Sequence, residues 1–163
     1  MIKLVDLLKE VGESSTKPYS YTVGGMSGSE TSAYFYFTTD LGTQYQAVIL
    51  DAKPSYDKEE YYDFVISFKV MGEDHSYVAN KQEVYRVMAT VVKIMKDWIA
   101  KFGEENVKRI QFTPAKTKGV DDTRRQNLYM AYVKKQIPNW KFEVEVDNDE
   151  ETFIFYNPNY KPQ

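Results

Sequence analysis

The chain has no cysteine and only one histidine, His75, among its 163 residues. Without cysteine there is no disulfide framework, no thiolate zinc site and no cysteine nucleophile. A single histidine excludes a metal site built from several histidines of one chain, and a Ser-His-Asp triad would have to use His75. We therefore expect no metal site, and the composition fits a reducing compartment.

Long apolar runs are also missing. No stretch approaches the roughly 18 consecutive apolar residues of a membrane-spanning helix, and the first residues lack the basic-then-apolar pattern of a signal peptide. The net charge of −3 gives no bulk attraction to nucleic acid or to an anionic membrane surface. The sequence therefore predicts a cytoplasmic protein with no membrane partner.

Aromatic residues are present in excess, with 14 tyrosines and 9 phenylalanines. Many of the tyrosines fall in strand-like segments, where rings pack well on a pleated surface. Exposed tyrosine rings can also form binding faces, because each ring combines an apolar body with a polar hydroxyl. We favour sheet packing, and the sequence leaves open whether the strands at 33–37 and 44–50 present an exposed aromatic face.

Residues 1–61 predict an N-terminal helix followed by an antiparallel meander. The helix is expected over 2–11, where apolar residues recur at three- and four-residue spacing. The glycine- and serine-rich stretch 24–29 lacks the Lys-Ser/Thr ending of a phosphate-binding loop and is interpreted as a hairpin or mobile loop. The strands of the meander are expected at 19–23, 33–38 and 44–50.

The most secure element in the remaining sequence is a long helix. Asn80 and Glu83 form a capping-box-like start, and Gly103 is a natural C-terminal stop. An apolar stripe at helical spacing should pack this helix on the sheet. Its members are Val84, Val87, Met88, Val91, Met95, Trp98, Ile99 and Phe102.

The other elements of residues 62–156 follow from the same kind of pattern. Strands are expected at 62–71, 107–112, 142–146 and 152–156, a second helix at 121–136, and a loose tail at 157–163. The buried stripe of the second helix should comprise Leu128, Tyr129, Tyr132, Val133 and Ile137. The length fits one domain, 1–163. Its predicted class is α+β, with a mixed, largely antiparallel sheet packed by one long and one shorter helix.

The order of elements from residue 62 onward resembles the second half of the GNAT acetyltransferase fold. The likeness is sharpest at Arg124-Arg125-Gln126-Asn127-Leu128-Tyr129, after the strand Arg109-Ile110-Gln111-Phe112. The Leu-Tyr pair is similar to the family segment in which a tyrosine often protonates the leaving thiolate of coenzyme A. The resemblance therefore makes Tyr129 the candidate general acid. The pattern also resembles small GNAT-like proteins of tailed phages, which implies the host cytoplasm or a virion.

The family's pyrophosphate-binding turn has no counterpart in the stretch 70–80. Such a turn holds the anion with backbone N–H groups at the start of the long helix. The stretch has one glycine, and it carries Glu73 and Asp74, which would repel a pyrophosphate. One like-charge pair at about 4 Å costs on the order of 4 kcal/mol at an effective dielectric constant near 20. This departure argues against coenzyme A binding.

We therefore predict a non-catalytic GNAT-like accessory protein that binds another protein and uses no cofactor. The first alternative is an N-acetyltransferase that uses acetyl-CoA, with Tyr129 as general acid. That alternative places coenzyme A between the strands at 62–71 and 107–112, where the family's strands splay. A fully paired, unsplayed sheet at that point would contradict it.

A second alternative is a binder of nucleic acid or phosphate. Six basic residues between 106 and 125, offset by Asp121 and Asp122, leave a charge of +4 on this stretch. The candidates for anion or partner binding are Lys116, Lys118, Arg124 and Arg125. A solvated basic loop is the simpler interpretation.

Acidic residues gather in two other places. Six lie within 143–151, where the simplest interpretation is a charged hairpin that resists edge-to-edge pairing, although calcium or a basic partner could also use it. The others, Asp51, Asp57, Glu59 and Glu60, are loop acids that no pattern places on one catalytic face.

Overall fold

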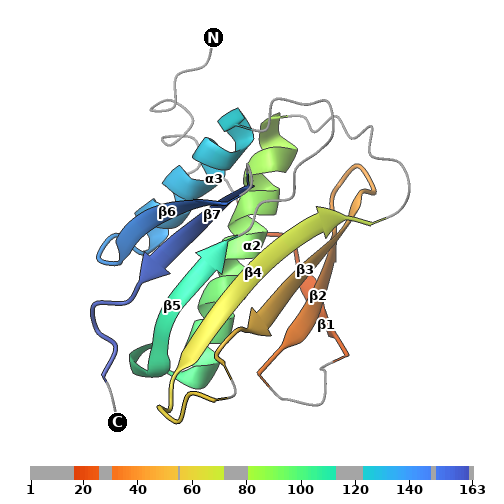
Figure 1. The fold of residues 1–163 in the computed structure, drawn as a ribbon. Coiled ribbons are helices and arrows are strands. Elements are labelled where there is room, and N and C mark those ends of the chain that lie inside the picture. The colour runs from red at the N-terminus through yellow and green to blue at the C-terminus, as the bar shows by residue number, and fades with distance from the viewer. Residues whose placement is uncertain are drawn as a thin grey trace.

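The computed structural model describes residues 17–25, 31–54, 56–71, 81–112, 123–147 and 150–161, with side chains described for all but 81–84, 123–129 and 150. In these residues the protein is an α+β fold, with a seven-stranded sheet and two α-helices (Figure 1). The predicted class is confirmed. The N-terminal helix expected at 2–11 and most of the loop expected at 24–29 lie outside the described residues.

The elements fall close to their predicted positions. In chain order they are β1 (Tyr21–Gly24), β2 (Ala33–Thr38), β3 (Gln44–Asp51), β4 (Tyr62–Val70), α2 (Lys81–Phe102), the 3₁₀ turn η1 (Glu104–Asn106), β5 (Val107–Phe112), α3 (Thr123–Gln136), β6 (Lys141–Asp147) and β7 (Glu150–Tyr156). The turn η1 was not predicted. It follows Gly103, whose positive φ of 88° ends α2 as its position suggested.

The strands lie in the order β1-β2-β3-β4-β5-β7-β6. Every pair is antiparallel except β4 and β5, which run parallel because α2 carries the chain back across the sheet between them. The sheet is thus mixed and largely antiparallel, as predicted.

Both helices lie on one face of the sheet, and α2 runs behind β4 and β5 in Figure 1. Alternate residues of the strands point into this side and form one aromatic-rich core. Trp98 of α2 makes edge contacts with Phe35 of β2 and Phe64 of β4, at 5.6 and 6.1 Å between ring centroids. Many of the predicted sheet-packing aromatics are therefore core residues.

Helix α2 is buried more widely than its predicted stripe. Ile94 and Thr90, which lie off that stripe, are fully buried as well. Thr90 accepts a hydrogen bond from the Tyr19 N–H at 2.8 Å, so the segment before β1 also packs against α2. Helix α3 buries Met130, Tyr132 and Val133, and Lys96 of α2 donates a hydrogen bond to Gln136 at 2.9 Å.

The expectation of a loose tail is wrong for residues 157–161. Asn157 is buried, and its side-chain amide donates to the backbone carbonyls of Glu104 and Val107 at 2.8 and 2.9 Å. The Tyr160 hydroxyl donates to Glu59 at 2.5 Å, and the Lys161 N–H donates to the carbonyl of Glu105. These hydrogen bonds attach residues 157–161 to η1 and β5. They also give partners to backbone carbonyls that would otherwise lack them.

Candidate binding surface on the open face of the sheet

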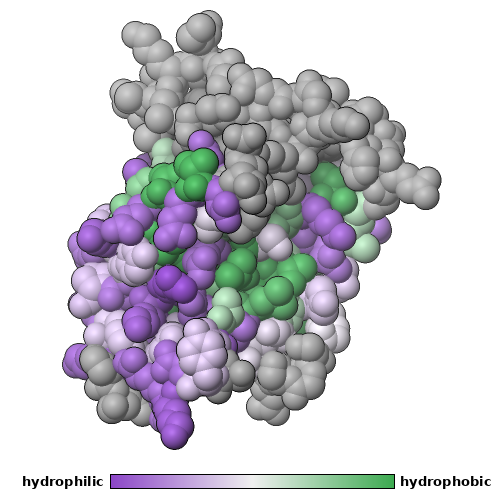
Figure 2. Space-filling view, in the orientation of Figure 1, coloured by the Kyte–Doolittle hydropathy of each residue, from purple (hydrophilic) through white to green (hydrophobic). Residues whose placement is uncertain are grey.

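No helix of the described residues covers the side of the sheet opposite α2 and α3, and we call this side the open face. Figure 2 views it directly, and hydrophobic residues gather near its centre with hydrophilic residues around them. Because side chains alternate along a strand, the open face takes every second residue of the central strands. These residues include Tyr34, Tyr36, Gln46, Val48, Leu50, Asp63, Val65, Ser67, Lys69, Arg109, Gln111, Ile154 and Tyr156.

Four of these residues form a contiguous apolar patch. In the strand register Tyr34 lies opposite Val48, and Leu50 lies opposite Val65. Tyr34 is 37% exposed and Leu50 is 46% exposed, while Val48 and Val65 are half-buried. Single exposed apolar residues are ordinary on a protein surface, but a contiguous patch with a polar border is a feature of binding surfaces. We call these four residues the apolar patch.

Tyr36 lies beside the apolar patch, and the position of its ring depends on the glycine at position 24. Tyr36 accepts a hydrogen bond from Gln46 at 3.1 Å. Its ring occupies the space where a side chain at position 24 would lie, so that a methyl group there would collide with the ring. The glycine at position 24, which the sequence suggested as part of a loop, therefore ends β1 and makes room for Tyr36 on the open face.

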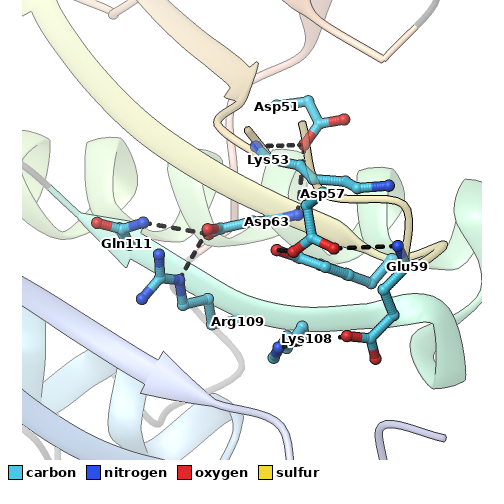
Figure 3. Close-up of polar contacts among 9 residues, drawn as sticks. Asp51, Lys53, Asp57, Glu59, Asp63, Lys108, Arg109 and Gln111 are labelled. Carbon is cyan, nitrogen blue, oxygen red and sulfur yellow. Dashed lines mark hydrogen bonds and ion pairs between the residues drawn. The ribbon is translucent and has the colours of Figure 1, made fainter. Parts of the chain in front are cut away.

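A buried carboxylate lies at the centre of this face. Asp63 is only 1% exposed, and its two oxygens accept hydrogen bonds from Arg109 Nε at 2.8 Å and from Gln111 Nε2 at 3.1 Å (Figure 3). Its backbone N–H lies 3.4 Å from Oδ1 of Asp51, which also accepts from the backbone of Lys53. We call Asp63, Arg109 and Gln111 the Asp63 network. It links β4 to β5, and it satisfies the carboxylate from two sides.

Arg109 is fixed by this contact but not enclosed by it. It bonds Asp63 through Nε, Figure 3 marks no bond from its two terminal nitrogens to that carboxylate, and its side chain is 35% exposed. Burial alone would lower the pKa of Arg109, but the hydrogen bond and charge of Asp63, with a contribution from Tyr156, raise it above its ordinary value. The guanidinium is therefore permanently charged and held in one orientation.

A second polar cluster lies at the start of β4, where two tyrosines meet acidic residues of the preceding loop. Tyr61 donates to Asp57 at 2.6 Å, and this bond is the main reason that the pKa of Tyr61 rises to about 12. The Tyr61 and Tyr160 rings meet edge to face at 6.2 Å. Lys108 Nζ lies 4.5 Å from the Tyr61 ring centre and 4.0 Å from Glu59. This cluster attaches the C-terminal segment to the loop and to β5.

A hollow of about 460 Å³ borders this second cluster. Its walls mix acids, a lysine, an amide and aromatic rings: Asp51, Lys53, Glu60, Tyr61, Tyr62 and Asn106. Lys53 and Lys108 already lie near the ring of Tyr61, at 5.2 and 4.5 Å from its centre. The ring is therefore engaged by the protein's own cations, which leaves it a poor platform for a ligand.

The residues singled out from the sequence are not brought together by the described structure. Arg124, Arg125 and Tyr129 lie on α3, but the structure describes the backbone of these positions and not their side chains. Lys116, Lys118, His75 and the stretch 72–80 lie outside the described residues. Of the basic stretch, Lys108 and Arg109 are described, and each is engaged with an acidic residue of the protein itself.

The strands between which coenzyme A would lie are paired where the structure describes both. The register runs in parallel from Asp63 opposite Arg109 to Ile66 opposite Phe112, after an irregularity at Tyr62. β4 continues to Val70, four residues past the last pair. A gap between the two strands is therefore absent over these paired residues.

Sequence reasoning did not find the Asp63 network. Asp63 occupies a polar position in an alternating strand, so nothing in the pattern distinguishes it from a solvated residue. Its burial depends on the parallel pairing of β4 with β5, which brings together residues 46 and 48 positions apart. The one usable sequence feature was the presence of arginine and glutamine at alternate positions of β5.

No family model, no curated protein and no solved structure matches the chain. Within the described ranges, no three acidic or histidine side chains are arranged to hold a metal ion. Of the two α-helices described, neither is long and apolar enough to cross a membrane.

Proposed function

We propose that this chain is a non-catalytic binding protein with a GNAT-like fold, and that it contacts a protein partner through the open face. The observation that carries the proposal is the apolar patch beside an arginine fixed by a buried carboxylate. Tyrosine and arginine are enriched in protein interfaces, and a contiguous exposed apolar patch with a polar rim marks interaction sites.

The rigidity of the surface adds to this argument. Binding is weakened when side chains must be ordered on association, at about 0.5–1.5 kcal/mol for each rotamer-rich side chain. Arg109 is already held by Asp63, and Tyr36 is held by Gln46. A partner would therefore meet side chains that are ordered before it arrives.

The GNAT-like part of the proposal rests on topology. From β4 onward the described residues form strand, helix, strand, helix, strand and strand, with the short turn η1 between α2 and β5. β4 and β5, joined by α2, are the parallel pair at which the family resemblance places the cofactor. An origin in a phage remains a prediction from the sequence.

An acetyltransferase with Tyr129 as general acid is the second candidate. The pairing of β4 with β5 up to Phe112 counts against coenzyme A between these strands, so this candidate needs the cofactor beside β4 beyond Ile66. Thermal unfolding with acetyl-CoA at millimolar concentration separates the two candidates, because a ligand that binds the native state raises its melting temperature. Under the binding proposal the melting temperature is unchanged. A rise of several degrees would favour the acetyltransferase.

The main proposal is tested by selecting peptides from a random library on the immobilised full chain. Selected peptides are then titrated against two variants, Leu50→Glu in the apolar patch and Leu41→Glu in the β2–β3 turn. Leu41 is 64% exposed and outside the open face, which makes it a matched control for the same substitution. We expect Leu50→Glu to weaken binding by at least about tenfold, since it places a charge in an apolar contact, and Leu41→Glu to leave it unchanged.

Two results would contradict the proposal. One is a selection that yields no binding peptide, and the other is equal loss of binding in both variants. The folded state of each variant is checked beforehand by circular dichroism and thermal unfolding.

A further inference from the structure

The accessible charge in the centre of the open face is positive. Lys69 is exposed, and the Arg109 side chain is partly exposed, whereas Asp63 has almost no solvent contact. Among the described side chains, the other acidic residues on this side of the strands lie along the edge strand β6, at Glu143, Glu145 and Asp147, beside the exposed Lys141. A partner that reaches the centre of the face therefore meets a guanidinium and not the carboxylate beneath it.

From this arrangement we infer that Arg109 receives an aspartate or glutamate side chain of the protein partner. The partner segment would then combine a carboxylate for Arg109 with apolar side chains for the apolar patch. This inference rests on the proposed function and names the chemistry of the partner at the same surface.

The geometry of Arg109 suits this role. A guanidinium has five N–H donors, and its bond to Asp63 uses the Nε side. The terminal nitrogens carry the other four N–H groups, and a hydrogen bond to the Tyr156 side chain uses one of them, which leaves three for a partner. A carboxylate can accept from both terminal groups at once, which gives a pair with a fixed orientation. Because Asp63 prevents the guanidinium from rotating, Arg109 is ordered before the partner arrives.

The position of Arg109 relative to the apolar patch sets the form of the partner segment. Arg109 of β5 lies opposite Asp63 of β4, and Val65 of the apolar patch lies two residues beyond Asp63 on β4. Gln111, next to Arg109 on this face, lies opposite both Val65 and Ile154. One short segment can therefore contact the guanidinium and the patch together. The apolar neighbours also lower the local dielectric constant, which strengthens a charged hydrogen bond.

A phosphate chain is a poorer fit for this surface than a carboxylate. Binding to nucleic acid depends on several cations that each neutralise a phosphate. On the central strands of the open face the accessible cations of the described residues are Arg109 and Lys69. Lys108 is directed into the tyrosine cluster and toward Glu59. The observations therefore favour an acidic protein segment, and an oligonucleotide serves as a test arm.

The peptide selection tests this inference when two further variants are added. Arg109→Lys keeps the charge and can still reach Asp63, but it removes the forked donor pair. Lys69→Gln removes the other accessible cation described on the central strands of the face and is the control. The probes are the peptides selected on the wild-type chain, synthesised with amidated C-termini so that a main-chain carboxylate cannot substitute for a side chain.

We expect the selected peptides to be enriched in aspartate or glutamate at one position. Their affinity should fall at least about tenfold on Arg109→Lys and less than about threefold on Lys69→Gln. Replacing the enriched acid by its amide should weaken binding to the wild-type chain by a similar factor. In Arg109→Lys the same replacement should have little further effect, because both changes break one contact.

The outcomes distinguish the inference from the proposed function. Peptides that are lost on Leu50→Glu but show no acidic enrichment, or bind Arg109→Lys as well as the wild-type chain, would overturn the inference and leave the proposed function standing. A selection without peptides dependent on Leu50 would overturn both. Tighter binding of a labelled single-stranded oligonucleotide than of any peptide, abolished in Arg109→Lys, would overturn the inference in favour of phosphate.

Discussion

At Asp63 a carboxylate lies almost without solvent contact between two donors of the neighbouring strand. A charge in such a place is stable only while its partners are present, since removing one partner leaves the other charge uncompensated. Asp63 of β4 is therefore stable only with Arg109 and Gln111 of β5 in place, and these two residues in turn are oriented by Asp63. Arg109 is the arginine that we propose as the polar anchor of the binding surface.

Asp63→Asn tests this dependence at the scale of the residue. The amide keeps one acceptor oxygen, but it loses the second acceptor and the negative charge beside Arg109, and we expect a loss of about 1–3 kcal/mol in the free energy of unfolding. Asp40→Asn is the control, because Asp40 pairs with Arg86 at the surface and its loss should stay within about 0.5 kcal/mol. Urea denaturation measures both. Equal losses would show that the charge of Asp63 is not what stabilises the network.

The C-terminal segment illustrates how an element outside the sheet is held. The amide nitrogen of Asn157 donates to two backbone carbonyls, of Glu104 and Val107. In Asn157→Asp a carboxylate oxygen would face these two acceptors, which adds repulsion to the lost hydrogen bonds. We expect a loss of about 2–4 kcal/mol in the free energy of unfolding, against less than about 0.5 kcal/mol for Asn159→Asp, which changes an exposed residue.

Denaturant unfolding of Asn157→Asp and Asn159→Asp measures the two losses in the free energy of unfolding. A third variant, Asn157→Ala, should show a loss between them. A loss in Asn157→Asp no larger than that in Asn159→Asp would mean that the segment is not fastened as described. The expectation of a loose tail would then be restored.

Strand β1 is tied to helix α2 by one polar contact. The Tyr21 hydroxyl donates to Asp97 at 2.6 Å. Burial, followed by the bond to Asp97, raises the pKa of Tyr21 to about 12, and the same bond holds the pKa of Asp97 below its usual range. The contact therefore stabilises the fold only while Tyr21 is protonated and Asp97 is ionised.

The stability difference between the wild-type chain and Tyr21→Phe should follow this double condition. The stabilisation that requires a protonated Tyr21 is fully present below the unfolded tyrosine pKa of about 10 and is lost as the pH rises toward 12. The stabilisation that requires an ionised Asp97 is present above the unfolded aspartate pKa of about 3.9 and is lost as the pH falls below that value. We expect a difference of about 0.5–1 kcal/mol between roughly pH 5 and 9, which narrows outside that window.

Chemical denaturation of the two proteins across this pH range provides the measurement. A difference that stays constant at high and low pH would show that the ring of Tyr21, and not its bond to Asp97, accounts for the effect.

For the molecule as a whole, the sequence pattern was sufficient where structure depends on neighbours in the chain. Helix α2 and strands β2, β5 and β7 were placed by periodicity, caps and turn residues, which are local properties. The Asp63 network and the contacts of Asn157 join residues about 50 positions apart. Such contacts depend on which strands pair, and no local pattern encodes that choice.

The same limit applies to the proposed binding surface. The sequence predicted strands at 33–38 and 44–50, yet it could not show which side of these strands no described helix covers. It also could not show that Val48 and Val65 complete a patch with Tyr34 and Leu50, because this depends on the register of three strands. The sequence left open whether the strands at 33–37 and 44–50 present an exposed aromatic face, and the structure places the partly exposed Tyr34 on the open face.

The central claim is that the open face of the sheet binds the partner. Backbone amide chemical shifts of the isotope-labelled chain, recorded during titration with a peptide selected on it, test this most directly. We expect the largest changes at Tyr34, Val48, Leu50, Val65 and Arg109, with little change along α2 at Val87 to Ile99. Changes confined to the helices, or to the edge strands β1 and β6, would contradict the account.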